Sequence, residues 1–333
     1  MKLIARLACL AVATAALVAC QSTRPPASSP AVQPVYVPPP VRSVPSQANA
    51  PLVQAASGVQ LAPSSIAREI LTSDKRLLSQ EQLINAVAAQ RFFVLGEQDN
   101  NDPQQWLSGW FVEQLAARGQ LAVLALGMLE GVGERVQLPR NASAAQVRDA
   151  LQWQQRTIGY PFERYERVVM AAVRAGVPLV PANLQRANLP FVQNDPTLDG
   201  AVNPNARNII MRHIIDTSCG LLNSSNAPQL TALTRVEIAQ DRAMAQAMRQ
   251  NLQPNKTVML LASQMHADRG IGVPQHLGNP SLLTVIMDEV RSDGGPPNQN
   301  ADVIWVTQAS APVNRCAGAR DGMIKPGRPL QIR

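Results

Sequence analysis

Six short and almost continuous apolar runs constrain the fold of this chain more than any other feature. They are RFFVL, LAVLALGML, VPLVPAN, TVMLLAS, SLLTVIM and DVIWVTQ. Strands without polar alternation are typical of a parallel sheet that is buried on both faces. Helical segments separate most of these runs, and parallel neighbours need such crossover connections. The sequence therefore predicts an α/β fold, with a mainly parallel sheet covered by helices on both faces.

Signals at helix ends support this alternation. Ser79 and Gln82 form a capping box that predicts a helix in QEQLINAVAAQ. Asp102 and Pro103 predict the start of a second helix, which Gly119 ends. The remaining predicted helices cover residues 147–155, 162–175, 203–218 and 229–252.

The N-terminus has the pattern of an export signal. Lys2 and Arg6 precede an apolar stretch that ends at Ala19, which is too short for a transmembrane helix. The sequence LVAC around Cys20 looks like a bacterial lipobox, which predicts residues 1–19 as a lipoprotein signal peptide and Cys20 as the acylated first mature residue. An ordinary signal peptide with an incidental cysteine is the alternative. Gln21 favours the outer membrane of a Gram-negative bacterium.

Residues 20–65 are rich in Pro, Ser and Gln, and no acidic residue precedes Glu69. This composition predicts a lipidated, semi-extended tether. The remainder, residues 66–333, is long enough to form one domain with a sizeable core.

The formal net charge is +7, and removal of Lys2 and Arg6 with the signal leaves 28 basic against 23 acidic residues, or +5. This mild excess and the predicted envelope location argue against a nucleic-acid partner. The expected partners are a small ligand and the membrane, through the lipid.

Two of the four cysteines remain after Cys9 leaves with the signal and Cys20 is acylated. In an oxidising compartment, Cys219 and Cys316 are expected to form a disulfide. Two unpaired buried thiols are the alternative.

Two polar residues follow predicted strands at positions where an α/β sheet binds ligands. Glu97 follows FFVLG and His266 follows VMLLASQM. Because ligands bind beyond the carboxyl ends of parallel strands, we expect this acid and imidazole to meet in one cleft. The pair suits metal binding, acid–base chemistry or ligation of an iron cofactor. Alternatively, Glu97 caps a turn and His266 makes only local hydrogen bonds.

Four segments carry a resemblance to a known family. They are FFVLGEQDNNDPQQW, the block from WQQRTIGYPFERYER to LVPANLQR, AQDRAMAQAM and VMLLASQMHADRGIGVPQHL. In this order they resemble the ChaN-like family of haem-binding lipoproteins, within the wider Tiki-like and erythromycin-esterase-like group. The resemblance covers most of residues 66–290 and implies helices packed on a largely parallel sheet.

The chain departs from the family pattern at several positions. No histidine follows two residues after Glu97, Gly127 stands where a glutamate is usual, and Ser263 and Met265 replace glycines. A metal-dependent hydrolase needs three or more protein donors, which Glu97 and His266 alone do not supply. Asp99 or Asp102 would have to substitute.

Haem binding requires fewer protein ligands than a hydrolytic metal site, because one axial ligand and an apolar slot suffice. The resemblance implies haem or iron-porphyrin binding, with His266, Tyr160 or Tyr165 as the iron ligand. Asn183 and Arg186 match the same family pattern. Arg186 could pair with a haem propionate or hold a loop through carbonyl oxygens.

Other polar residues receive structural interpretations. His213 is predicted to be half-buried on a helix and His276 to lie on a surface loop. Asp241 and Arg242 are interpreted as an ion pair or as charges on a helix surface.

Three functions remain open at this point. The leading hypothesis is a lipid-anchored, haem-binding protein of iron uptake, which is not an enzyme. The second is a binding or scaffold protein that kept the fold and lost the site, and the third is a metal-dependent hydrolase of the Tiki or esterase type. The resemblance also implies a possible homodimer, since haem can lie between two protomers in this family.

Overall fold

The computed structural model describes residues 62–63, 65–98, 100–131, 133–278, 281–290, 300–311 and 316. The predicted signal peptide, the acylated Cys20, nearly all of the tether and Asp99 lie outside these residues. No helix within the described ranges is both long and apolar enough to cross a bilayer.

A seven-stranded sheet forms the centre of the domain, in the order β1-β7-β6-β2-β5-β3-β4. Every neighbouring pair is parallel except β1 and β7. The strands are β1 (Ala67–Thr72), β2 (Phe92–Glu97), β3 (Leu121–Glu130), β4 (Leu179–Asn183), β5 (Thr257–Ser263), β6 (Leu282–Glu289) and β7 (Val303–Thr307). All six predicted strands are therefore present, and the mainly parallel sheet is confirmed.

Alternate residues of each strand enter two separate apolar cores. In β2, Phe93 and Leu95 pack with one layer of helices, whereas Phe92 and Val94 pack with the other. Burial of both faces explains why the strands read as unbroken apolar runs.

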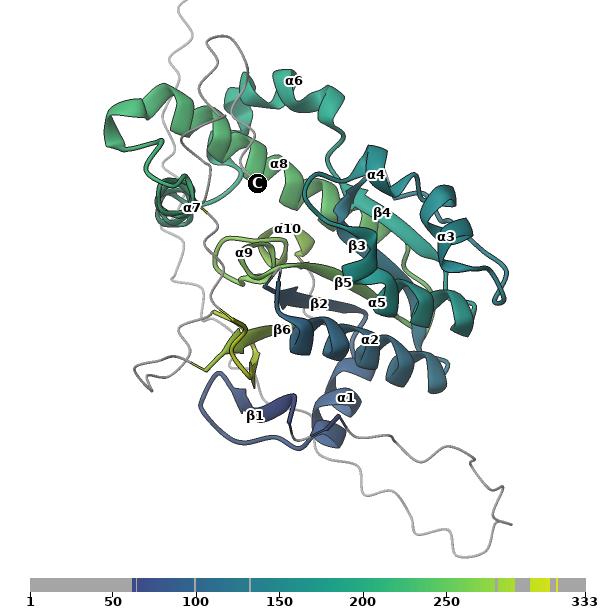
Figure 1. Cartoon of the computed structure of the whole chain (residues 1–333). Helices are drawn as coiled ribbons and strands as arrows, with labels where there is room; N and C mark the ends of the chain where they lie inside the picture. The colour runs from purple at the N-terminus through teal and green to yellow at the C-terminus, as the bar shows by residue number, and fades with distance from the viewer. Residues whose placement is uncertain are drawn as a thin grey trace, which may run out of the picture. The chain divides into compact units, whose positions relative to one another are not determined.

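The first layer holds the helices from the N-terminal half of the domain. They are α1 (Gln80–Ala88), α2 (Asp102–Ala117), α3 (Ala144–Ala150), α4 (Trp153–Arg156) and α5 (Phe162–Ala175). Helices α2 and α5 lie side by side, as Figure 1 shows. Trp110 and Phe111 of α2 make edge contacts with Trp305 of β7, so aromatic packing fixes α2 against the sheet.

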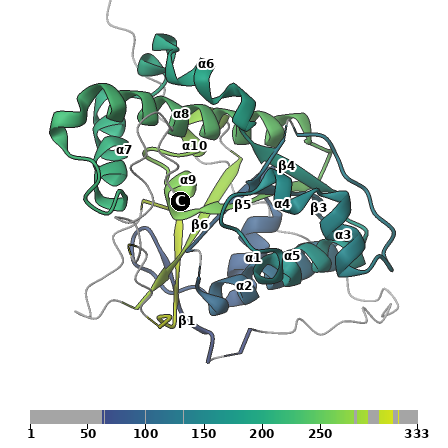
Figure 2. The same ribbon diagram turned by 45° about the horizontal axis from the view of Figure 1, so that its top comes forward.

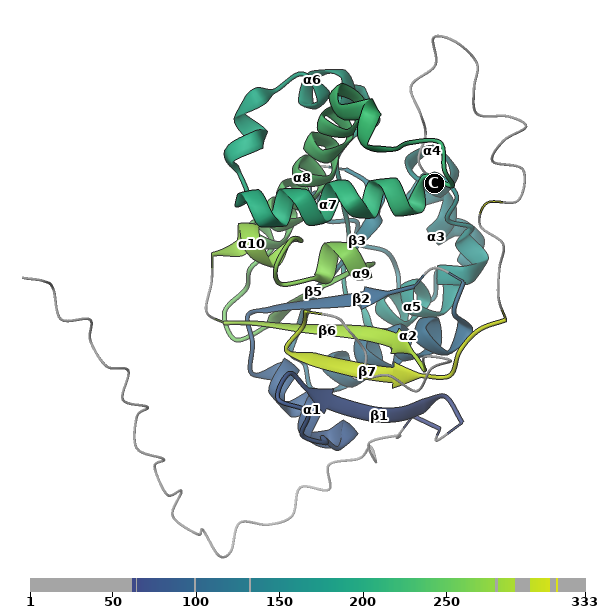
Figure 3. The same ribbon diagram turned by 90° about the vertical axis from the view of Figure 1, so that its left-hand side faces the viewer.

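The second layer is built on the longest helix, α8 (Ala227–Gln250), with α9 (Gln264–Ala267) and α10 (Pro274–Leu277). Met244 and Met248 of α8 pack on the sheet. Two helices, α6 (Leu189–Gln193) and α7 (Pro204–Thr217), pack against α8 (Figures 2 and 3). They share a smaller apolar cluster with α8.

The predicted disulfide is confirmed. Cys219, which follows α7, is bonded to Cys316 with a Cα–Cα distance of 5.5 Å.

The edge strand β1 was not predicted from the sequence. Its residues AREILT mix charged and apolar side chains, as an antiparallel strand at the edge of a sheet does. It pairs only with β7 among the described strands.

Candidate functional site

The structure builds a buried acid–imidazole cluster beyond the carboxyl end of β5. Ser263 ends the strand and immediately precedes α9, and this short helix turns His266 towards α8. His266 Nδ1 lies 2.8 Å from Asp241 Oδ1, and His266 Nε2 lies 4.0 Å from Glu237 Oε2. The side chains of His266, Asp241 and Glu237 are 13%, 3% and 21% exposed, so the cluster is largely withdrawn from solvent.

The helical period places both carboxylates beside the ring. Glu237 and Asp241 are four residues apart on α8, and residues at this spacing share one face of a helix. The α9 segment is held against the sheet because Gly96 of β2 has no side chain. A Cβ at Gly96 would lie 2.7 Å from Ala267 Cβ.

Burial and the charges within the cluster shift the pKa values of all three groups. Burial raises the pKa of Asp241 to about 6, against the attraction of His266. Burial also raises the pKa of Glu237. Burial opposes a charge on His266, but the two carboxylates outweigh it and raise the pKa of His266. Perturbed groups of this kind gather at functional sites.

His213 of α7 is exposed, and not half-buried as the sequence predicted. Desolvation by neighbouring protein atoms and the positive charge of His266 lower the pKa of His213. Within the part of the chain that the structure describes, no three His, Cys, Asp or Glu side chains are arranged to hold a metal ion.

Asp241 corrects one interpretation made from the sequence. It is 2% exposed and paired with His266, so it is not a charge on the helix surface. The one available signal is its position within the block that resembles the family's RDxxMA helix, and spacing alone could not reveal its partner.

Glu97 ends β2 and is turned towards the first helical layer. It is 3% exposed, and the Ser108 hydroxyl of α2 lies 3.1 Å from its Oε2 as a donor. The loop that follows is fixed separately. Gln98 N donates to Gln104 Oε1, and Asn101 caps the start of α2.

Glu97 and His266 do not share one cleft. Successive side chains of a strand point to opposite faces. Gly96 faces α9, so Glu97 faces α2, while His266 bonds to α8 on the other face. Both residues lie at the carboxyl edge of the sheet, as predicted, but in different layers.

Gly127 shows why the second family glutamate has no counterpart here. A Cβ at Gly127 would lie 2.9 Å from Ala262 Cβ and 3.0 Å from Leu261 O. This backbone therefore has no room for a larger side chain at that position. Glu130, three residues later, binds Arg186 instead.

Asn183 and Arg186 both make structural contacts at the end of β4. Asn183 Nδ2 donates to Gly127 O, which ties β4 to β3. The Arg186 guanidinium contacts Glu130 and donates to Gln155 O at 2.7 Å. The Arg186 guanidinium therefore binds a carboxylate and a carbonyl oxygen of its own chain.

The two candidate tyrosines differ in access. Tyr165 is 1% exposed and packs against Trp153 in the first core. Tyr160 is partly exposed and precedes Pro161 at the start of α5. Of the two, Tyr160 is the one that an external ligand could reach without disturbing the core.

His276 lies in α10, partly buried, and not on a surface loop. Its Nε2 is buried without a hydrogen-bond partner among the described residues. Burial, with the nearby charges of Arg242 and Arg249, lowers the pKa of His276 to about 4.

This histidine gives a prediction for acid stability. The folded pKa of about 4 lies below the ordinary value of 6.5, so the unfolded chain binds more protons between these values. Stability should fall as pH drops through this window, by up to about 3 kcal/mol from His276 alone. Urea unfolding at pH 7 and pH 4 should show a smaller acid loss for His276→Gln than for the wild type. An equal loss in both proteins would exclude this assignment.

Comparison with known proteins places these features in a family. The family described as "Haem-binding uptake, Tiki superfamily, ChaN" matches residues 83–277. The structure titled "Cofacial heme binding to ChaN of Campylobacter jejuni" is similar, with a TM-score of 0.59 and 17% identity, over 72% of this chain and 97% of the other. The type III effector HopBA1 overlaps less well, with a TM-score of 0.35 and 12% identity over 68% of this chain and 92% of the effector. No curated protein matches the chain.

The fold is α/β, and the matching family model belongs to the Tiki superfamily. The chain belongs to the ChaN family of haem-binding uptake proteins, because the match extends over more than half of it. The resemblance inferred from the four sequence segments is thus confirmed.

Proposed function

We propose that this protein binds haem or another iron-porphyrin and takes part in iron uptake at the cell envelope. The observation that carries the proposal is the family match, which runs from α1 to α10. The Campylobacter jejuni protein with a similar fold is described by its title as binding haem cofacially.

His266 and Tyr160 are the candidate iron ligands among the described residues. A metal-ligating histidine usually gives its other ring N–H to a carboxylate, which orients the ring and raises its basicity. Asp241 is placed to accept this bond from His266 Nδ1, which leaves Nε2 as the candidate donor to iron. Tyr160 is the second candidate, since a phenolate oxygen also ligates haem iron. The bound group would supply an iron atom that accepts one of these donors.

Lipid attachment at Cys20 and an outer-membrane location belong to the same proposal. The support is the LVAC sequence and the Pro-rich segment that follows it. A tethered domain at the membrane would keep a released porphyrin close to the envelope.

Titration with haemin tests the proposal. The full chain without its signal should shift the Soret band away from that of free haemin, and the change should saturate at one haem per protomer. Gel filtration during the titration should report whether haem loading creates a dimer, as cofacial pairing would require. A spectrum that stays identical to free haemin would exclude haem binding and favour a scaffold that retains only the fold.

A further inference from the structure

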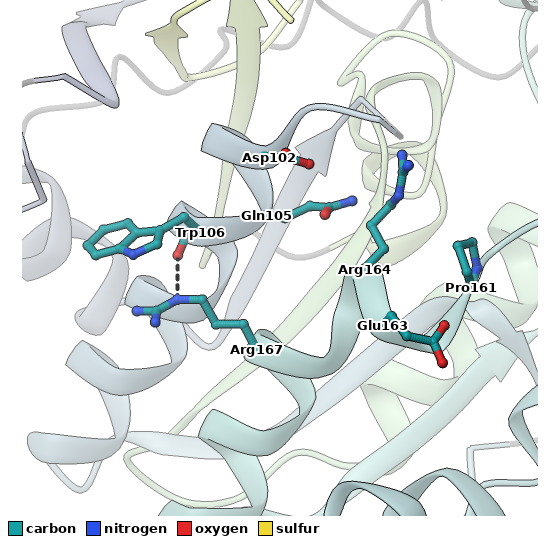
Figure 4. A pocket seen from close by; sticks show the side chains of 7 residues that line it. All are labelled: Asp102, Gln105, Trp106, Pro161, Glu163, Arg164 and Arg167. Atoms are coloured by element: carbon teal, nitrogen blue, oxygen red, sulfur yellow. Dashed lines mark hydrogen bonds between the residues drawn. The ribbon is translucent and has the colours of Figure 1, made fainter.

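A groove of about 400 Å³ lies between the N-terminal turns of α2 and α5 (Figure 4). Asp102, Gln105 and Trp106 line it from α2, and Glu163, Arg164 and Arg167 line it from α5. It belongs to the first helical layer, whereas His266 lies in the second. The groove is therefore separate from the acid–imidazole cluster.

Gln105 is the most informative residue of this groove. Its side chain lines the groove although the residue is only 7% exposed. Its Nε2 is buried and has no hydrogen-bond partner among the described residues. Figure 4 shows the amide turned away from α2 and towards Arg164. A buried donor without a partner is costly to the fold and is rare in native proteins, so an acceptor from a ligand is the natural complement.

Two guanidinium groups from α5 line the same groove. Arg164 donates to the Asn100 side chain, which holds the guanidinium near the start of α2. Arg167 lies over the Trp106 ring, with its Cζ 4.6 Å from the ring centroid, and pairs with Glu113 at 3.2 Å. Arg167 therefore covers one face of the Trp106 ring, and Arg164 is the arginine towards which the Gln105 amide points.

The N-termini of the two helices also favour a negatively charged ligand. Both α2 and α5 begin at this groove, and a helix N-terminus favours negative charge. α5 begins at Pro161 without a side-chain cap. Of the two carboxylates that line the groove, Glu163 lies 3.9 Å from Arg148, whose charge offsets it. Asp102 is therefore the carboxylate that would repel a bound anion.

We propose that the α2–α5 groove binds a small organic carboxylate with a flat apolar body. The carboxylate would accept hydrogen bonds from Gln105 Nε2 and the Arg164 guanidinium, and the body would lie against Trp106 and Pro161. The unpartnered amide, the two arginines and the two helix starts all favour such a ligand. The groove uses neither His266 nor its layer, and it adjoins the second candidate iron ligand, Tyr160, through Pro161.

Benzoate is a suitable probe, and Trp106 is a built-in reporter. The other three tryptophans, Trp110, Trp153 and Trp305, are at most 1% exposed. Fluorescence of the full chain should change saturably with sodium benzoate at constant ionic strength, and Trp106→Phe should abolish the change. Benzyl alcohol, which has the ring without the carboxylate, should bind at least about tenfold more weakly, as expected for one charge-assisted bond.

Variants of Gln105 and Asp102 make the test specific to this groove. Gln105→Glu keeps the shape but replaces the donor with a carboxylate, and it should weaken benzoate binding by about tenfold or more. Asp102→Asn removes a negative charge and should tighten binding, a gain that misfolding cannot produce. The proposal is overturned if wild-type protein shows no saturable response, or if Gln105→Glu and Asp102→Asn both bind benzoate as the wild type does.

Discussion

Replacement of both Cys219 and Cys316 by serine is expected to lower the free energy of unfolding by about 4–5 kcal/mol. The bond closes a loop with a sequence separation of 97, which contains α8 and strands β5, β6 and β7. In the chain-entropy model, a loop of this length removes a large part of the freedom of the unfolded state. The loss is large relative to the total stability of a typical domain.

Reduction of the wild type provides the matched control for this prediction. Urea unfolding of the double serine variant, of oxidised wild type and of wild type in a thiol reductant should be compared at one pH. The reduced wild type should unfold like the variant, since both lack the same bond. Unfolding midpoints that are equal in all three samples would show that the bond does not contribute to stability.

Replacement of Asp241 by alanine is expected to lower the free energy of unfolding by about 3–5 kcal/mol at neutral pH. The reason is that the His266 ring stays buried but loses the carboxylate that pairs with it. His266 Nδ1 lies 2.8 Å from Asp241 Oδ1, and Asp241 is 3% exposed. Glu237, at 4.0 Å from Nε2, can offset only part of the loss. Asp241→Asn should cost less, because the amide can still accept a hydrogen bond from the ring.

A double-mutant cycle separates the pair from its surroundings. The combination Asp241→Ala with His266→Ala should be less destabilising than the sum of the two single changes. The pKa of His266 is raised above 6.5 in the fold, and that of Asp241 lies at about 6, so both groups are charged only between these two values. The ionic pairing is lost as pH rises through the folded pKa of His266. The coupling energy should therefore shrink at alkaline pH. Additive effects of the two variants at neutral pH would contradict the assignment of a coupled pair.

The sheet could be predicted well from the sequence, because a strand that is buried on both faces appears locally as a continuous apolar run. Each of β2 to β7 is an apolar run that can be recognised without its neighbours, and Ser79 with Gln82 marks the start of α1 directly. β1 was missed because one face of an edge strand can remain polar, and so its pattern is weak.

The candidate site was predicted only in part. The position of His266 at the sheet edge follows from the strand before it, and that prediction was correct. Its partners were not predictable, because Asp241 and Glu237 come from a helix whose rotation about its own axis depends on tertiary packing. The expected pairing of His266 with Glu97 was wrong. The end of a strand shows which edge of the sheet a residue lies at, but the alternation of side chains along the strand decides which face of the sheet it points to. Gly96 towards α9 and Glu97 towards α2 show this directly.

We propose that His266, oriented by Asp241, is the residue that binds the iron of a porphyrin. The most direct measurement is a haemin titration of wild type, His266→Gln and His276→Gln, followed through the Soret band at neutral pH. The two variants carry the same chemical change in the same protein, and both histidines lie beyond β5. We expect His276→Gln to bind haemin as the wild type does and His266→Gln to lose the shifted band. A shifted band of equal position and affinity in His266→Gln would contradict this proposal.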